Sequence, residues 1–335
     1  MKTNHRALTA AVVLSALTGF VDAAAAQSFS GGKNVRIVVG SSAGGGFDAF
    51  GRLAGRNLGQ YLPGKPNIVV SNLPGAGSMK SVQSMKAQPA DGTYMVIFNP
   101  GQVLNSLVVP KKVKMKFTDV SFVASMTADA RVCYAWHTVG VKTLDDLLKR
   151  KQFATGHTGK NASNYIDAAV LKNVFGANLK QIVGYPGSAE QRLAVEKGEL
   201  DGDCGSYDSI PDNWIKDKKI DIFARVSSVT TPELAKIPFV GDLVTGEKRQ
   251  IVNLLTAHSD IFRPVIVSKE TPADKLATLR KAMWDMLSGK PFLDDAKRSG
   301  RTVISPMKGE DVEKMIAELY KTPAKLVAIS AKAVE

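Results

Sequence analysis

Glycine-rich turns that carry serine, threonine and asparagine are the features of this sequence most suited to chemistry. They occupy residues 41–46, 74–78, 155–163, 185–188 and 205–208, each directly after a strand-like segment. Glycine lets backbone N–H groups approach a ligand closely, and a helix N-terminus adds partial positive charge. Together the turns predict a site for carboxylate or phosphate oxygens.

The polar side chains of these turns each have two interpretations. Asp48 stands at a helix start, where capping of free N–H groups is the favoured role and contact with a cation or hydroxyl is the other. Ser41, Ser42 and Ser188 either bind a carboxylate or satisfy the backbone of their own turns.

The hypothesis that the protein is a serine hydrolase rests on Gly40-Ser-Ser-Ala-Gly44. This segment matches the G-x-S-x-G nucleophile elbow, with Ser42 as the nucleophile. The motif follows the first strand of the exported chain, so no earlier loop supplies the usual second oxyanion donor. The downstream histidines, His137, His157 and His258, stand in no motif. A serine hydrolase is therefore the disfavoured alternative.

Cofactor motifs are weak. Residues 44–49 loosely fit the dinucleotide-binding motif G-x-G-x-x-A. However, Ser71 and Asn72 occupy the position at the end of the second strand where such a site requires an acidic residue. Residues 40–47 lack the lysine of a phosphate-binding loop, and no His, Cys or Asp spacing favours a metal. We expect no cofactor and no metal.

The amino-terminal residues predict export. Lys2, His5 and Arg6 form a short basic segment, residues 7–21 are mainly apolar, and small residues at 23–26 precede Gln27. This pattern is typical of a cleavable signal peptide over residues 1–26, with an uncleaved membrane anchor as the rival reading. We expect a periplasmic protein of about 309 residues.

The chain is basic, with a formal net charge of +13 that falls to +12 when residues 1–26 are removed. Such an excess is compatible with nucleic acid, membrane surfaces or anionic small molecules. Export argues against nucleic acid. The basic residues are scattered apart from a short run at 111–116, so the charge gives modest support to an anionic ligand.

Strand-like and helix-like segments alternate, which predicts an α/β fold with parallel sheets. The first unit has strands at 35–39, 68–70 and 94–98, and the second has strands at 132–136, 153–155, 181–183 and 200–204. A strand at 265–267 and helices near 272–288, 291–299 and 309–327 close the chain. Two α/β lobes with a cleft between them are expected.

Five ordered motifs carry a family resemblance: Val38-Val-Gly-Ser-Ser-Ala-Gly-Gly-Gly-Phe-Asp48 with Arg52, Asn72-Leu-Pro-Gly-Ala-Gly77, Pro89-Ala-Asp-Gly92, Gly184-Tyr-Pro-Gly-Ser188 and Gly198-Glu-Leu-Asp201. With them the chain resembles the solute-binding components of tripartite tricarboxylate transporters, the Bordetella uptake gene family. The resemblance implies a non-catalytic, two-lobed periplasmic binding protein of type II-like fold. It also implies a small-molecule carboxylate ligand, membrane permease subunits as partners and a monomeric state.

The resemblance also implies that the turns at 41–48 and 185–188 hold a ligand carboxylate, partly through water. Three positions depart from the family pattern: Ser41-Ser42 replaces a Phe-Pro pair, Phe47 replaces Thr, and Pro186 replaces a basic residue. Phe47 hints at a ring-bearing or longer acid. A partner that presents its ligand to a sensory receptor is the alternative function.

The same resemblance sets the lobe boundaries and a cysteine pairing. Lobe 1 is expected at 27–130 and 255–335, and lobe 2 at 131–254, with crossovers near 121–131 and 253–263. Arg131 and Arg263 near the crossovers either pair with a ligand carboxylate or form hinge salt bridges. Cys133 and Cys204 are expected to form a disulfide on adjacent strands.

The expected ligand-binding residues come from these turns and from the matching ends of the second lobe. They are Ser41, Ser42, Ala43, Gly44, Gly45, Gly46, Phe47, Asp48, Gly77, Ser78, His157, Thr158, Ser163, Tyr185, Pro186, Gly187, Ser188, Ser206 and Tyr207.

Overall fold

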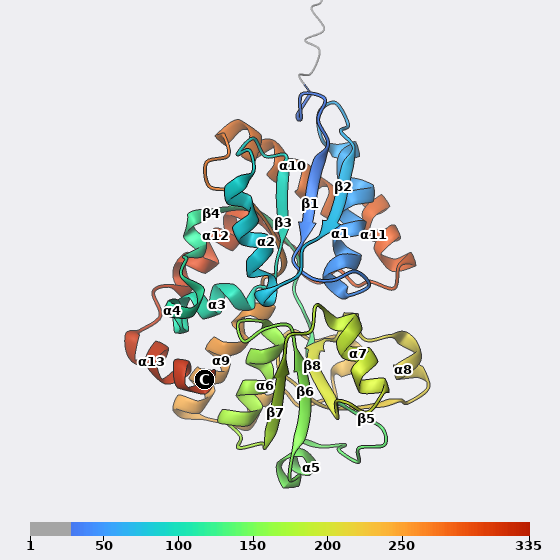
Figure 1. The fold of residues 1–335 in the computed structure, drawn as a ribbon, viewed down its shortest axis with the longest axis vertical. Coiled ribbons are helices and arrows are strands. Elements are labelled where there is room, and N and C mark those ends of the chain that lie inside the picture. Colours follow the sequence, from blue (N-terminus) through green and yellow to red (C-terminus); the bar gives the residue numbers. More distant parts are fainter. Residues whose placement is uncertain (1–27) are drawn as a thin grey trace, which may run out of the picture.

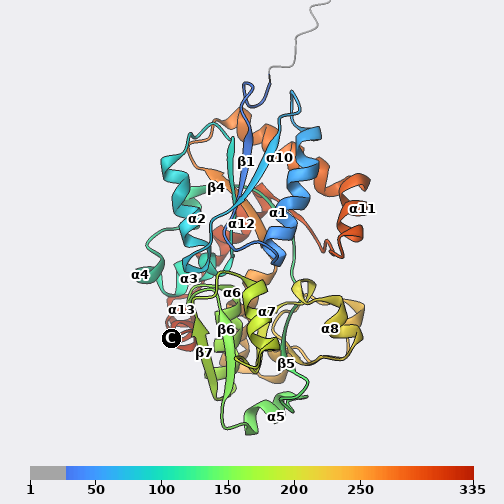
Figure 2. The same cartoon turned by 45° about the vertical axis from the view of Figure 1, so that its right-hand side comes forward.

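The computed structural model describes residues 28–335, so the predicted signal peptide lies outside the described residues. The chain folds into two α/β lobes, each built on its own sheet, and the lobes lie one above the other in Figure 1. The same two layers of strands and covering helices are visible after a turn of the molecule in Figure 2. The predicted two-lobed fold is therefore confirmed.

The sheet of the first lobe has six strands in the order β11-β4-β10-β3-β1-β2. Strands β1, β2 and β3 are parallel, as predicted, whereas β10 runs antiparallel to β3 and β4. The strands of this sheet are β1 (Val35–Val39), β2 (Ile68–Asn72), β3 (Tyr94–Ile97), β4 (Val120–Thr127), β10 (Phe262–Ser268) and β11 (Met307–Lys308).

The sheet of the second lobe has five strands in the order β7-β6-β8-β5-β9. Strand β6 is parallel to β7 and β8, and β5 is antiparallel to β8 and β9. The strands are β5 (Arg131–Trp136), β6 (Phe153–His157), β7 (Leu179–Val183), β8 (Gly202–Ser206) and β9 (Ile220–Arg225).

Helices cover both faces of the first sheet because β1 is apolar on both faces. Val35, Ile37 and Val39 pack with residues of α1 and α10, whereas Val38 packs with residues of α2 and α12. The helices are α1 (Gly46–Asn57), α2 (Met79–Ser84), α3 (Gly101–Val108), α4 (Pro110–Val113), α5 (Leu144–Lys149), α6 (Ser163–Asn173), α7 (Ser188–Glu196), α8 (Asp212–Lys216), α9 (Gly246–Thr256), α10 (Ala273–Ser288), α11 (Lys290–Arg298), α12 (Gly309–Leu319) and α13 (Ala324–Ala333).

The chain passes between the sheets twice, at residues 128–130 and at residues 257–261. The last helix, α13, lies within the range expected for the first lobe but contacts α9 and α6 of the second. Its Ala333 joins the same hydrophobic cluster as Val252 and Ile166, so it ties the end of the chain to the second lobe (Figures 1 and 2).

Three strands, β4, β9 and β11, are not among the segments predicted from sequence, which assigned residues 121–131 to a crossover. Strand β4 is buried along its whole length although it contains serine and threonine. Ser125 Oγ donates to Phe262 O at 3.0 Å and Thr127 Oγ1 donates to Ala128 O at 2.7 Å. These bonds satisfy hydroxyls whose polarity hides the strand in a hydropathy pattern.

Cys133 and Cys204 form a disulfide, as expected, between directly paired residues of β5 and β8. The bond joins residues 71 positions apart in the sequence.

Within residues 28–335, no helix has the length and apolar character needed to cross a bilayer. That same stretch also contains no cluster of His, Cys, Asp and Glu that would hold a metal ion.

Candidate ligand site between the lobes

A cavity of about 70 Å³ lies between the lobes and is lined from both sheets. Of the predicted site residues, the structure brings eight to its wall: Ser41, Gly46, Phe47, Ser78, Thr158, Gly187, Ser188 and Ser206. The others are not part of the wall: Ser42, Ala43, Gly44, Gly45, Asp48, Gly77, His157, Ser163, Tyr185, Pro186 and Tyr207.

The amino-terminal ends of α1 and α7, one from each lobe, meet at this cavity. Their N-cap residues are Gly45 and Gly187, and neither helix receives a side-chain cap. The first three N–H groups of each helix have no acceptor among residues 28–335, while the fourth bonds to the N-cap carbonyl. Uncapped N–H groups and two helix dipoles converge here, which favours an anion.

Asp48 shapes the first turn from behind instead of facing the cavity. Its carboxylate accepts hydrogen bonds from Gly44 N at 3.0 Å, Arg52 Nε at 3.0 Å and Asn72 Nδ2 at 2.9 Å. Burial alone would raise the pKa of Asp48, but these hydrogen bonds outweigh it and hold the pKa below its ordinary value. Asp48 is thus ionised, fixes the conformation of the turn, and is not part of the cavity wall.

His157 is also behind the wall. Its side chain is fully buried, with Nε2 at 2.9 Å from Thr155 Oγ1. Burial lowers the pKa of His157 to about 3, so the ring is neutral at physiological pH. Its backbone carbonyl accepts from Gly184 N and Tyr185 N at 3.0 and 3.2 Å, which fixes the second turn.

The two turns touch each other directly across the lobe interface. Ser42 N donates to Pro186 O at 3.2 Å, and Ser42 Oγ donates to Glu190 Oε2 at 2.7 Å. Arg192 of α7 donates through Nη2 to Gly44 O at 3.1 Å. The lobes are therefore in a closed arrangement. The partner of Ser42 Oγ is a carboxylate, where a nucleophile elbow requires a histidine.

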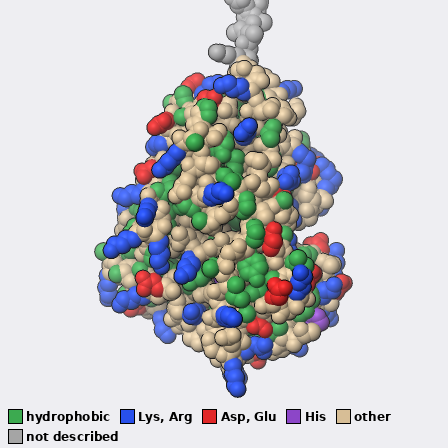
Figure 3. All heavy atoms as spheres, viewed as in Figure 1, with side chains coloured by type: hydrophobic (Ala, Val, Ile, Leu, Met, Phe, Trp, Pro, Cys, Tyr) green, Lys and Arg blue, Asp and Glu red, His purple; other side chains and the backbone are tan. Residues whose placement is uncertain are grey.

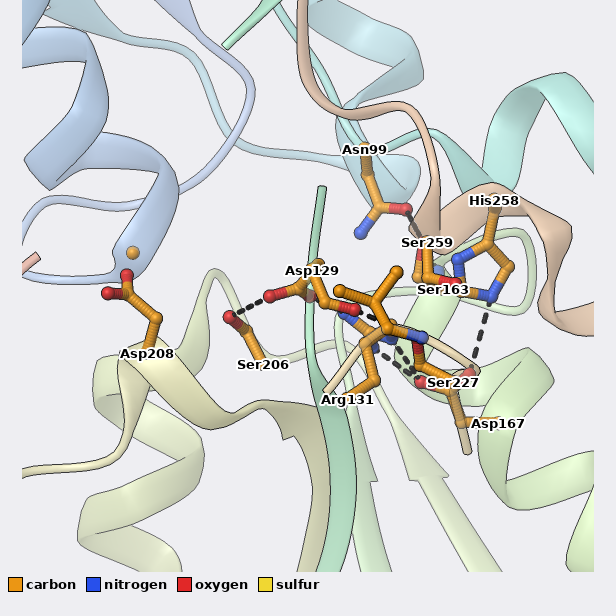
Figure 4. Close-up of polar contacts among 12 residues, drawn as sticks. Asn99, Asp129, Arg131, Ser163, Asp167, Ser206, Asp208, Ser227, His258 and Ser259 are labelled. Carbon is orange, nitrogen blue, oxygen red and sulfur yellow. Dashed lines mark hydrogen bonds and ion pairs between the residues drawn. The ribbon is translucent and has the colours of Figure 1, made fainter. Parts of the chain in front are cut away.

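A buried ionic network joins the two crossovers, as Figure 4 shows. Arg131 donates to Asp129 at 2.8 Å and to Asp167 of α6 at 2.7 Å. His258 Nε2 on the second crossover lies 3.3 Å from Asp167, and Asp129 N donates to Ser259 O at 2.8 Å. Burial lowers the pKa of Arg131, but the two carboxylates outweigh it and raise the pKa above its ordinary value.

Arg263, on β10, forms a second ion pair across the lobes. Its Nη2 lies 3.1 Å from Asp208 Oδ2, and its guanidinium carbon lies 4.0 Å from the centre of the Phe50 ring. Both arginines singled out in the sequence thus pair with acids of the protein. Arg131 also reaches the cavity wall.

Several residues of the wall were missed by sequence reasoning, which searched the turns after strands. Tyr134 and Asp203 lie inside strands, and Gln191 and Arg192 lie in the second turn of α7. One local signal in the sequence could have indicated that β8 lines the cavity, namely the polar residue Asp203 at an inward-facing position of this strand. The full set missed is Gly40, Asn99, Tyr134, Asn164, Gln191, Arg192, Asp203, Cys204, Gly205, Ser209, Ile210 and Phe262.

Charge on the visible face does not gather at one place. Figure 3 shows lysine and arginine side chains spread over both lobes. On this face the basic residues are therefore distributed and form no single patch.

Comparison with solved structures shows the same fold in periplasmic binding proteins. MatC from Rhodopseudomonas palustris with bound malate is 15% identical, with 90% of this chain and 99% of that chain covered and a TM-score of 0.68. An R. palustris protein with adipate is 16% identical, with 89% and 97% covered and a TM-score of 0.70. The periplasmic binding protein BugD is 18% identical, with 90% and 97% covered and a TM-score of 0.69.

No protein-family model matches the chain, and no curated protein sequence matches it. At identities of 15–18%, the likeness to these structures establishes the shared fold.

Proposed function

We propose that this chain is a periplasmic solute-binding protein that captures a small organic carboxylate for a tripartite tricarboxylate-type transporter. The observation that carries the proposal is the pair of uncapped helix N-termini, α1 and α7, which face one cavity between the lobes from opposite sides. Their N–H groups are oriented donors that a carboxylate would satisfy without a counter-charge.

Two further observations support this function. Solved structures of the same fold contain malate and adipate, both small carboxylates. The glycine-rich motifs at residues 38–48 and 184–188 resemble those of the Bordetella uptake gene family, and they form the loops that meet across the cavity. The proposed partners are membrane permease subunits, and the proposed working form is a monomer.

Capture would proceed by lobe closure about the two crossovers. In the open form, the helix ends of the two lobes separate and water reaches their N–H groups. The ligand carboxylate then bridges the helix ends, and the contacts of Ser42 with Pro186 and Glu190 stabilise the closed form. No chemical step is assigned to Ser42, because its hydroxyl is engaged by Glu190.

The proposal is tested by thermal unfolding of the mature protein with mono-, di- and tricarboxylates and aromatic acids. A ligand at about 100 times its Kd adds about 2.7 kcal/mol, which raises the Tm by a few degrees. Matched amides or alcohols of the same length are the controls and should give no shift. A response to the neutral analogues equal to that of the acids, or no response at all, would contradict carboxylate binding.

Export is tested separately by expressing the full chain in a Gram-negative host. The periplasmic fraction should contain protein that begins at Gln27, as measured by intact mass. Protein that keeps residues 1–26 in the membrane fraction would instead show an anchored form.

A further inference from the structure

An acidic side chain lines the cavity without a basic partner. Asp203 on β8 is 5% exposed, and its Oδ1 accepts a hydrogen bond from Cys204 N at 2.8 Å. Its Oδ2 has no hydrogen-bond donor and no ion-pair partner among residues 28–335, yet it is not sealed from the cavity. A buried carboxylate of this kind is costly unless it takes up a proton or a cationic group in the cavity pairs with it.

Tyr134 adds a second free polar group at the same place. It is the cross-strand partner of Asp203 in the β5–β8 pairing, so the two side chains stand next to each other on one face of the sheet. Tyr134 is 3% exposed and lines the cavity, and its hydroxyl forms no hydrogen bond with any described residue. Asp203 and Tyr134 together form an acceptor-rich floor.

Arg192 lies on α7, which contributes another part of the wall, and it carries a positive charge and only hydrogen-bond donors. It donates to Ser209 O at 2.9 Å, to Gly44 O at 3.1 Å and to Ser188 Oγ at 3.2 Å, but it forms no ion pair with a described carboxylate. The cavity therefore has one cation and one acid that the protein itself leaves unpaired. Arg192 lies on the same helix whose uncapped N-terminus faces the cavity.

Burial raises the pKa of Asp203 well above its ordinary value. The nearby charges of Arg131 and Arg192 lower that pKa, and Asp167 raises it further, so burial dominates. Burial also lowers the pKa of Arg192. Both groups are thus poorly solvated, and each gains most from a ligand group of opposite charge.

We propose that the ligand is a zwitterion of the amino-acid class, whose carboxylate binds the α1 and α7 N-termini with Arg192 and whose protonated amine binds Asp203 and Tyr134. An ammonium group has three donors and a full positive charge, which match Oδ2 of Asp203 and the Tyr134 hydroxyl. A ligand hydroxyl would supply a single donor and no charge to offset burial of the carboxylate. This inference rests on the proposed function, since it names the ligand class for the same cavity.

The test compares acids that differ only in the amino group, such as aspartate with succinate and glutamate with glutarate, by isothermal titration calorimetry. Because a hydrogen bond to a charged group contributes about 1.5–3 kcal/mol, the amino acid of the bound pair should bind about ten-fold tighter or more. Asp203→Asn keeps the shape and the bond to Cys204 N but removes the charge. It should reduce the preference to about three-fold or less, with the plain acid bound as well as before or better.

Asp212→Asn is the matched control, because it removes one negative charge from the same lobe at a side chain that is 75% exposed. This variant should keep the wild-type preference. Equal affinity of wild-type protein for both members of each pair, or an unchanged preference in Asp203→Asn, would overturn the inference while leaving carboxylate capture intact. A complete lack of binding by amino acids and plain acids would instead contradict the proposed function itself.

Discussion

Gly187 is the position where one added methyl group should hinder lobe closure specifically, apart from any effect on folding. It is the N-cap of α7, with an extended backbone at φ −172° that any residue adopts. A Cβ built there would lie 2.3 Å from Ser42 Oγ and 3.3 Å from Ser42 N, both in the other lobe. Gly187→Ala therefore obstructs the closed form and leaves the open form unhindered.

The size of the effect follows from overpacking. Forcing a methyl group into a packed contact costs about 1–3 kcal/mol. If the ligand is held only by the closed form, that cost appears in the binding free energy and weakens the Kd about 5- to 150-fold. Replacing the glycine N-cap of α7 by alanine destabilises the open and the closed form equally. This effect therefore lowers the Tm of the ligand-free protein without shifting the equilibrium between the two forms.

A double-mutant cycle with Ser42→Ala supplies the assay. Ser42→Ala removes the atom at 2.3 Å, and the next contacts of the added Cβ are at 3.3 and 3.4 Å. Calorimetric titration with the tightest carboxylate should therefore show Gly187→Ala much weaker than wild type. The double variant should return close to the Ser42→Ala single variant. Wild-type affinity in Gly187→Ala, or a double variant as weak as Gly187→Ala, would refute closure through this contact.

Three further outcomes are expected. Replacing Cys133 and Cys204 by alanine should lower the free energy of unfolding by about 2–4 kcal/mol in denaturant titrations, and reductant should give the same loss in the wild type but none in the variant. Because the pKa of Asp203 is raised in the folded protein, the free energy of unfolding should fall as the pH rises from the ordinary pKa of 3.8 through the raised pKa. Asp203→Asn should remove this decrease. A variant whose free energy of unfolding differs between pH 4 and pH 8 as much as that of wild type would contradict the prediction. Asp48→Ala should destabilise the protein by about 1–3 kcal/mol, because it removes the charged acceptor of the hydrogen bonds from Gly44 N, Arg52 Nε and Asn72 Nδ2, whereas a variant as stable as wild type would show that water replaces the carboxylate.

Part of the wall of the candidate site could be predicted from the sequence because its signals are local. The turns that contain Gly45 and Gly187 are short runs of glycine and serine between a strand and a helix, and such runs specify a helix start whatever surrounds them. The parallel order of β1, β2 and β3 likewise follows from strand and helix segments that alternate along the chain.

Other features depended on contacts between distant segments. Asp48 was correctly placed at a helix start, but only the position of Asn72 on β2 shows that its carboxylate braces the turn from behind. Helix α13 continues the first lobe in sequence, but in space it packs on α9 and α6 of the second lobe as well as on α3 of the first.

The sequence by itself determined two sets of glycine- and serine-rich turns at strand ends, and a fold of two α/β lobes. Only the tertiary structure decided which side chains complete the wall. Tyr134 and Asp203 meet through the register of β5 and β8, and Arg192 reaches Gly44 because the lobes close. Strand register and lobe packing are set by many long-range contacts together, so no short segment of the chain encodes the pairing of these groups.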